Sequence, residues 1–389
     1  MVKLRLPKLP WKWLGVGLGS VALVIGVTYQ IVTQNNSLHE LQAIKSELTV
    51  NLTKAQAELA DLKNQDQYKK NKELEDTIKN MEKTYDSAVT TYEKILDLNP
   101  TGKTAADLNK QLASALALLA KRNYASASGA LAKINSQIDA LSQAASGLSL
   151  GNVPANNNAP GSGYQRQMVH SDVGDFAVDI VAGDLGSTKV WVDTASDSDC
   201  RDNCPVLSLA SYVSRTGAYA GVNGSYFCPA AYPSCAGKTN SFDTLLMNYK
   251  KKYFNSDNNV YSTVPAAIFG GGWIRFVGRS SDWGRDTGID SMIANQPLLL
   301  SSGNIVFGGD GDPKKGSRGA RSFVGAKGNT VYIGVAYNVT VAEMAHVLKT
   351  LGLNDALNLD SGGSTALWFG GYKVGPGRDI PNAVLFVRK

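Results

Sequence analysis

The sequence predicts an α+β domain built on a mixed β-sheet at its C-terminal end, behind an N-terminal transmembrane helix and an α-helical coiled-coil stalk. Three observations predict this architecture. The chain has 389 residues, which is too long for one ordinary domain. Its first third carries apolar residues at helical and heptad spacing. From residue 164 onward, short strand-like runs outnumber helical ones, which favours α+β packing around one core.

The first 32 residues predict a membrane anchor. Residues 1–12 contain no acidic residue and these basic ones: Lys3, Arg5, Lys8 and Lys12. Residues 13–32 are uncharged, and about 20 helical residues span the roughly 30 Å of a bilayer's hydrocarbon. A basic flank marks the cytoplasmic end of a span, so the rest of the chain is expected outside the cytoplasm. A cleaved signal peptide is the alternative, but no convincing small-residue cleavage site follows.

Residues 35–146 predict a helical stalk or hairpin. A heptad of apolar residues, interrupted by Lys45, comprises Leu38, Leu41, Leu48, Leu52, Ala55, Leu59 and Leu62. The pattern resumes from Leu74 to Ile95, and Asn99-Pro100-Thr101-Gly102 then ends the helix before two further amphipathic segments. The stalk either binds partners, including a second copy of the chain, or serves as a spacer of roughly 90 Å.

Residues 147–163 are rich in Asn, Gly, Pro and Ser and predict a flexible linker, after which residues 164–389 form the second folded part. Its predicted strands are 176–181, 189–192, 219–222, 264–269, 273–277, 330–335 and 384–387. A helix is predicted over 341–351, where Thr340 and Glu343 have the spacing of a capping box. We therefore expect Glu343, the only Glu of this part, to cap the helix rather than to catalyse a reaction.

The cysteines predict two disulfides. All of them lie between residues 200 and 235: Cys200, Cys204, Cys228 and Cys235. Outside the cytoplasm disulfides are favoured over a zinc site, and neither neighbouring pair has Cys-x-x-Cys spacing. Four cysteines allow three pairings, of which the local one, Cys200 with Cys204 and Cys228 with Cys235, closes two short polar loops.

The stretch LNLDSGGSTALW, residues 357–368, is the strongest candidate for a site. Leu357 and Leu359 alternate with Asn358 as in a half-buried strand, and Asp360 follows at the strand end. The Gly362-Gly363 pair permits a tight turn or the close approach of a ligand. A carboxylate beside such a turn can hold a small polar ligand, although a plain hairpin turn explains the same residues.

Several blocks of the C-terminal part occur in a familiar order. They are AGVNGSYF at 220–227, DSMIANQPLLL at 290–300, GARSFVG at 319–325, ALNLDSGGS at 356–364 and GPGRDIPNA at 375–383. In this order they resemble the phosphodiester glycosidase family. The resemblance implies a hydrolase of the alpha-N-acetylglucosaminidase type that acts on a sugar-1-phosphodiester. The family usually has three glycines after its Asp, and here Ser361 takes the place of the first one, which leaves the exact substrate open.

The resemblance implies a catalytic set of Asp360, Asn223 and Arg321. Glycoside cleavage normally uses two carboxyl groups, and Asp360 lies in a matched block at a strand end. The planar guanidinium of arginine fits phosphate oxygens, so Arg321 is expected to clamp the substrate, with a surface salt bridge as the alternative. Asn223 could bind sugar hydroxyls, or it could simply form an Asn-Gly turn.

Other residues are expected to bind substrate or to rank second. The expected binding residues are Arg378, Tyr226, Gly362, Gly363, Ser364 and Arg215. The second-rank candidates, which turns or caps also explain, are Asp243, Asp290, Asp379 and His170. His346 is expected to be solvated, and Phe227 is expected to pack in the core.

Composition limits the partners. The net charge is +6, and no basic run with interleaved aromatic residues appears in the soluble part, which argues against nucleic acid. No cofactor is expected and no metal ligand is assigned. Two groups of acidic residues could bind calcium: one comprises Asp197, Asp199 and Asp202, and the other Asp310 and Asp312. Neither group has the pattern of an EF-hand loop. The sequence thus predicts a membrane-anchored, extracytoplasmic glycosidase of envelope or exopolysaccharide glycans; the alternative is a non-catalytic envelope scaffold that binds glycan and recruits partners through its stalk.

Overall fold

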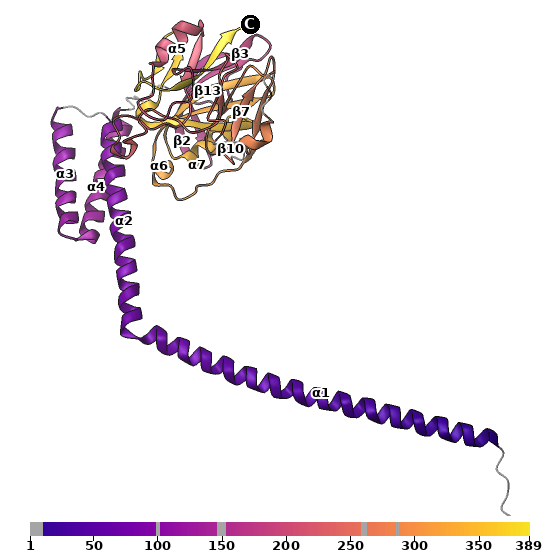
Figure 1. Ribbon diagram of the computed structural model, residues 1–389. Helices are drawn as coiled ribbons and strands as arrows, with labels where there is room; N and C mark the ends of the chain where they lie inside the picture. The colour runs from indigo at the N-terminus through magenta and orange to yellow at the C-terminus, as the bar shows by residue number, and fades with distance from the viewer. Residues whose placement is uncertain (1–10, 99–101, 146–152, 258–262, 285, 287) are drawn as a thin grey trace, which may run out of the picture. The chain divides into compact units, whose positions relative to one another are not determined.

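The computed structural model describes residues 11–98, 102–145, 153–257, 263–284, 286 and 288–389 (Figure 1). The side chains of residues 11–22, 66, 102, 103 and 142–145 lie outside this description. The chain forms two compact units, residues 1–80 and 81–389. Each unit is described by itself below.

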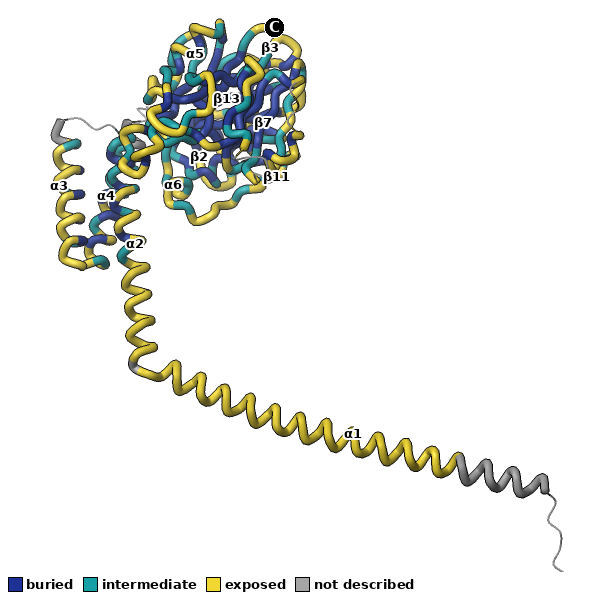
Figure 2. Tube along the Cα trace, viewed as in Figure 1, coloured by how far each residue is buried: buried dark blue, intermediate teal, exposed yellow. Residues whose placement is uncertain are grey.

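The first unit is helical, and the side chains that the structure describes in it form no buried core. It contains α1 (Trp11–Asn64) and the beginning of α2 (Asp66–Leu98). Every described side chain from Leu23 to Asn80 is exposed, which Figure 2 shows as a continuous exposed tube along α1. Among the described residues, no helix combines the length and the apolar character of a membrane span. Residues 1–10 and the side chains of residues 13–22 of the predicted anchor lie outside the described part, and the span remains a prediction.

The second unit begins with a small helical bundle. The end of α2 packs with α3 (Gly102–Ala120) and α4 (Tyr124–Ala145). Its buried apolar residues come from all three helices: Ala88, Ile95, Leu108, Leu112, Ala115, Leu119, Ala127, Leu131, Ile134 and Ile138. The amphipathic spacing that predicted a hairpin thus buries its apolar faces within the chain.

Three sheets make up the rest of the unit. The first, of seven strands, has the order β1 (Gly163–Ser171), β2 (Gly174–Asp184), β13 (Thr330–Val339), β12 (Gly319–Lys327), β14 (Asp355–Ser361), β10 (Leu298–Ser301) and β11 (Asn304–Ile305). The second, of five, has the order β16 (Tyr372–Val374), β15 (Leu367–Phe369), β4 (Ala220–Asn223), β17 (Asn382–Arg388) and β3 (Thr188–Thr194). The third, also of five, has the order β6 (Tyr253–Phe254), β5 (Leu246–Met247), β9 (Ser291–Ala294), β7 (Ala266–Phe269) and β8 (Ile274–Val277).

The three sheets share one core, and short helices cover their outer faces. Residues as far apart in the chain as Val181, Phe269 and Leu357 meet in the central cluster. On the other face of the first sheet, α7 (Val341–Thr350) buries Met344 and Leu348. The helix α5 (Leu209–Thr216) packs on the second sheet, and the four-residue helix α6 (Pro313–Gly316) precedes β12. The α+β class is therefore confirmed.

The prediction of a mixed sheet was wrong, because every strand ladder among the described residues is antiparallel. Parallel neighbours need a long crossover connection, usually a helix, and this part of the chain has few helices to supply one. The described parallel pairing is a single bridge between Ala155 and Met168.

Two local predictions are confirmed. Thr340 caps α7 by accepting from the Glu343 backbone N–H at 3.1 Å, while the Glu343 carboxylate accepts from the Thr340 N–H at 2.8 Å. The disulfides join Cys200 to Cys204 and Cys228 to Cys235, as the local pairing required.

Candidate functional site

A cavity of about 510 Å³ lies within the second unit, between the helical bundle and the sheets. The end of α2 contributes Glu93 and Asp97, and the sheets contribute Arg321 of β12 and Asp360 of β14. Its walls carry both acidic and basic side chains, so the cavity suits a charged, polar ligand better than an apolar one.

Asp360 lies where β14 ends, as the alternation of Leu357 and Leu359 predicted. Its backbone N–H donates to the Gly224 carbonyl at 2.9 Å, and its Oδ1 accepts from the Ser361 N–H at 2.8 Å. Burial raises the pKa of Asp360 to about 7, against weaker opposing effects from Ser364, the Ser361 N–H and Arg378, and Asp97 adds a further rise. A carboxyl group with this pKa can both give and take a proton near neutral pH.

The Gly362-Gly363 turn makes room for two charged side chains. Gly362 has φ +66, and a Cβ there would lie 2.6 Å from Asp97 Oδ2. A Cβ on Gly363 would lie 2.2 Å from Arg378 Nη2. A side chain at either position would push the Asp97 carboxylate or the Arg378 guanidinium from its present place, so the glycines make room for this ion pair, and close approach was one explanation that the sequence offered.

Arg378 has one guanidinium nitrogen occupied and one without a partner. Its Nη2 donates to Asp97 Oδ1, and its backbone N–H donates to the Gly363 carbonyl at 2.8 Å. The guanidinium lies 5.0 Å from the centre of the Tyr232 ring. Its Nη1 is buried and has no hydrogen-bond acceptor. A buried donor without an acceptor is costly, so this nitrogen is suited to receive an oxygen of a ligand.

Arg378 does not itself line the cavity but adjoins its wall through Asp97, whereas Lys314 is a basic group on the wall that is held by a buried carboxylate. The Lys314 ammonium donates to Glu93 Oε2 at 2.6 Å, and Glu93 is only 2% exposed. Arg321 is 8% exposed, and its Nη2 donates to the carbonyls of Lys314 and Ser317 at 2.6 and 2.5 Å. These contacts fix the segment that presents Lys314 to the cavity, so Arg321 lines the site and also supports it.

Asn223 lies beneath the cavity and does not line it. It is fully buried, and its Nδ2 donates to the Asp360 carbonyl at 2.7 Å while its Oδ1 accepts from Ser322 Oγ at 2.7 Å. The structure thus places Asn223 as a support for Asp360 and not as a contact for sugar hydroxyls. Tyr226 and Ser364 do line the cavity, and Asn358 Nδ2 donates to the Tyr226 hydroxyl at 2.6 Å.

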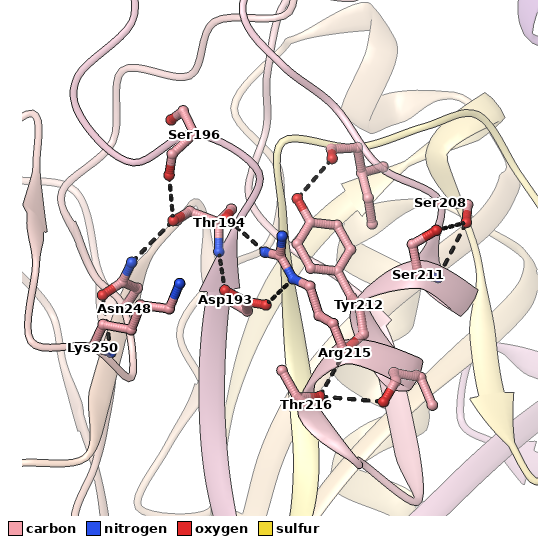
Figure 3. A network of polar contacts seen from close by, with 12 residues as sticks. Asp193, Thr194, Ser196, Ser208, Ser211, Tyr212, Arg215, Thr216, Asn248 and Lys250 are labelled. Atoms are coloured by element: carbon pink, nitrogen blue, oxygen red, sulfur yellow. Dashed lines mark hydrogen bonds and ion pairs between the residues drawn. The ribbon is translucent and has the colours of Figure 1, made fainter.

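Arg215 is not part of this cavity. Figure 3 shows it on α5, where its Nε donates to Asp193 Oδ2 at 2.6 Å and its Nη2 donates to the Thr194 carbonyl at 2.7 Å. Its guanidinium also lies 4.7 Å from the centre of the Tyr212 ring. The expectation that Arg215 could bind phosphate did not include this network, because the acceptors, Asp193 and Thr194, lie on β3 and not near Arg215 in the sequence.

The second-rank candidates also lie away from the residues that line the cavity. Asp243 and Asp379 are exposed, and Asp290 is partly buried beside the third sheet. His170 pairs with Asp175 at 2.7 Å on the surface of β1, while His346, expected to be solvated, bonds Asp172 at 2.8 Å. Within the described residues, no group of three or more His, Cys, Asp or Glu side chains is arranged to hold a metal ion.

Glu93 and Asp97 were not predicted from the sequence as site residues. The two acids stand four residues apart on α2 and so share one face of that helix. That spacing was a usable signal for a common face, but nothing in the sequence indicated which surface the face would meet.

Comparisons with known proteins agree with the resemblance seen in the motifs. The phosphodiester glycosidase family matches residues 216–387, which covers the cavity residues from the sheets and excludes α2. No match to a curated protein sequence is found. The C-terminal part of the chain therefore resembles this family, as the sequence predicted.

Three solved structures are similar to part of this chain at low sequence identity. The catalytic domain of zebrafish N-acetylglucosamine-1-phosphodiester alpha-N-acetylglucosaminidase, auto-inhibited by pro-peptide, is 18% identical, with 61% of this chain and 87% of that chain covered and a TM-score of 0.45. A hypothetical protein from Synechocystis is 12% identical, with 58% and 62% covered and a TM-score of 0.41. A putative exported protein from Burkholderia pseudomallei is 12% identical, with 55% and 74% covered and a TM-score of 0.36. The match thus spans less than two thirds of the Synechocystis protein.

Proposed function

We propose that the protein is a hydrolase that cleaves the bond between a sugar and a phosphodiester in an envelope or exopolysaccharide glycan. The family match over residues 216–387 supports the reaction class. The observation that carries the proposal is Asp360, a carboxyl group with a pKa raised to about 7 on the wall of a cavity that also holds cationic side chains.

Each side chain has a distinct task in this proposal. Lys314 on the cavity wall, and Arg378, which adjoins the wall through its bond to Asp97 and has a buried, unpartnered Nη1, bind the anionic oxygens of the phosphodiester. Asp360 exchanges a proton with the reacting group, and a phosphate leaving group needs less help from an acid than an alcohol does. Asn223 keeps Asp360 in place through its carbonyl.

The end of α2 affects how such a substrate enters. Asp97 holds Arg378 Nη2, so a phosphodiester that binds Nη2 as well as the unpartnered Nη1 has to displace the carboxylate. Two anions then compete for one guanidinium, and the cavity discriminates against weakly charged ligands. A plain glycoside without phosphate is expected to be a poor substrate for the same reason.

The site of action is also a proposal. The basic N-terminal flank and the uncharged stretch 13–32 support a single-pass membrane anchor with a cytoplasmic N-terminus. The two disulfides, Cys200–Cys204 and Cys228–Cys235, support an oxidising compartment for the domain. Protease added to intact spheroplasts should digest the domain, and complete protection would contradict this topology.

A product assay tests the enzyme activity directly. Purified full-length chain should release free sugar from sugar-1-phosphodiester analogues and leave the matched plain glycosides almost intact. Glycan binding without any turnover, by a chain with both disulfides formed, would instead favour the non-catalytic scaffold.

A further inference from the structure

The exposed apolar face of α1 is the largest feature that the proposed function does not use. Its heptad core positions are Leu38, Lys45, Leu52 and Leu59 at a, and Leu41, Leu48, Ala55 and Leu62 at d. The leucines at these positions are 51% to 68% exposed in the single chain. Such a stripe of leucines on one helix face is unfavourable in water unless a partner covers it.

We propose that this face binds the same face of a second copy of the chain, and that residues 38–62 form a parallel two-stranded coiled coil. Leucines at both a and d supply the core that such a pair buries. The helix continues without a break from Trp11 to Asn64, so the seam runs along one continuous helix. No described side chain from Leu23 to Asn80 is buried, so this part of the chain does not cover the seam itself.

Charge favours an identical partner in parallel orientation. In a parallel pair each g residue faces the e residue five positions on in the partner, which places Glu58 opposite Lys63 of the partner. The other facing positions carry no charge, so nothing opposes this register: Ser37 with Gln42, Ile44 with Thr49, and Asn51 with Gln56. An antiparallel pair would bring g positions together and lose the Glu58–Lys63 attraction.

Lys45 adds to this specificity. A single charged residue at an a position weakens a coiled coil but restricts its register and the number of strands. Lys45→Leu should therefore strengthen self-association. If the helix only acted as a spacer, the same change would leave the molecular mass of the protein in solution unchanged.

The first test compares two apolar residues that are similarly exposed in the single chain. Leu48 at d and Val50 at f are 68% and 63% exposed. Full-length protein in mild detergent should have the mass of a dimer by light scattering coupled to size exclusion. Leu48→Asp should weaken the dimer by about a hundredfold or more, because two core leucines and their contacts are lost, and Val50→Asp should leave it intact. A monomeric wild type, or equal effects of both variants at equal helical content by circular dichroism, would overturn the proposal.

The second test fixes the direction of the strands. The native cysteines are all joined in disulfides, so an introduced cysteine is the only thiol. A parallel pair places position 41 beside its equivalent, whereas an antiparallel pair centred on the same leucines separates them by roughly 27 Å. Leu41→Cys should give a disulfide-linked dimer under mild oxidation, and Ala43→Cys, on the outer face, should not. A dimer in which Leu41→Cys fails to cross-link would refute the parallel register.

Discussion

Two arginine–aspartate pairs in the second unit lead to opposite conclusions about function. At the corner of β3 and α5, Arg215 donates through Nε and Nη2 to Asp193 and to the Thr194 carbonyl, and Asp193 is 1% exposed. Beside the cavity, Arg378 donates through Nη2 to Asp97 of the cavity wall, while its Nη1 stays buried without an acceptor. In the first pair, Arg215 and Asp193 have hydrogen-bond partners for their buried groups. In the second pair, Arg378 keeps one donor that a ligand can bind.

This difference shows what separates a structural ion pair from a binding site. Both pairs contain the same chemical groups, and both arginines lie near a tyrosine ring, that of Tyr212 or that of Tyr232. What differs is the unused hydrogen-bonding capacity and the presence of a cavity with Asp360 on its wall. A candidate binding site is therefore better judged by its unsatisfied hydrogen-bond donors than by its charged residues alone.

The largest expected effect comes from removing the charge of Asp360 beside the second pair. Asp360→Asn keeps the size of the side chain but cannot exchange a proton, so turnover should fall by about a hundredfold or more. Release of sugar from a phosphodiester analogue measures it, with near-UV circular dichroism to check the fold. A folded Asp360→Asn protein with full activity would make residues 357–368 a simple hairpin.

Breaking the first pair should act on stability and not on chemistry. Arg215→Ala leaves the buried Asp193 carboxylate without its cation, and the free energy of unfolding should fall by about 1–3 kcal/mol. The expected loss is below that of a fully buried pair because the Arg215 side chain is 36% exposed. Urea denaturation measures it, and turnover by the folded fraction should match wild type. A large loss of turnover at unchanged stability would place Arg215 in the site after all.

Asp97→Asn should have a smaller effect, and this effect should be a gain in ligand affinity, because the change releases Arg378 from its ion pair. The neutral amide holds the guanidinium less tightly than the carboxylate does, so inorganic phosphate should bind about tenfold more tightly. Titration calorimetry on the full chain measures this affinity, and Asp86→Asn, an exposed acid on the same helix, is the matched control. Unchanged phosphate affinity in Asp97→Asn, with or without turnover, would show that Asp97 does not compete for the site.

The two pairs also mark how far the sequence could predict this structure. Features set by neighbours in the chain were predictable: the strand that ends at Asp360, the capping box of Thr340 and Glu343, and the two local disulfides. Each depends on backbone preferences or on short loops, which the local sequence determines.

Features that depend on distant contacts were not predictable. Arg378 and Asp97 are 281 residues apart, and no local pattern indicates that α2 reaches the sheets. Arg215 was misjudged for the same reason, since it lies on α5 and its partner Asp193 lies on β3. The antiparallel order of the sheets likewise depends on which strands meet across the core, and the strand patterns alone do not specify it.

The smallest expected effect is a shift in pH dependence, and it links Asp97 to Asp360. The pKa of Asp360 is raised to about 7, so a reaction that needs its protonated form should be fully active below that pH and fall about tenfold per unit above it. The same rise favours the folded state at low pH, and this stability is lost as the pH rises from about 4 through about 7.

Asp97 contributes to the rise in the pKa of Asp360 through its charge, so Asp97→Asn should move the alkaline limb of kcat/KM to lower pH by less than about one unit. Asp139→Asn removes another carboxylate from the cavity wall and should shift the limb less. A limb that stays in place in Asp97→Asn, or that moves to higher pH, would show that the two carboxylates do not interact in the working enzyme.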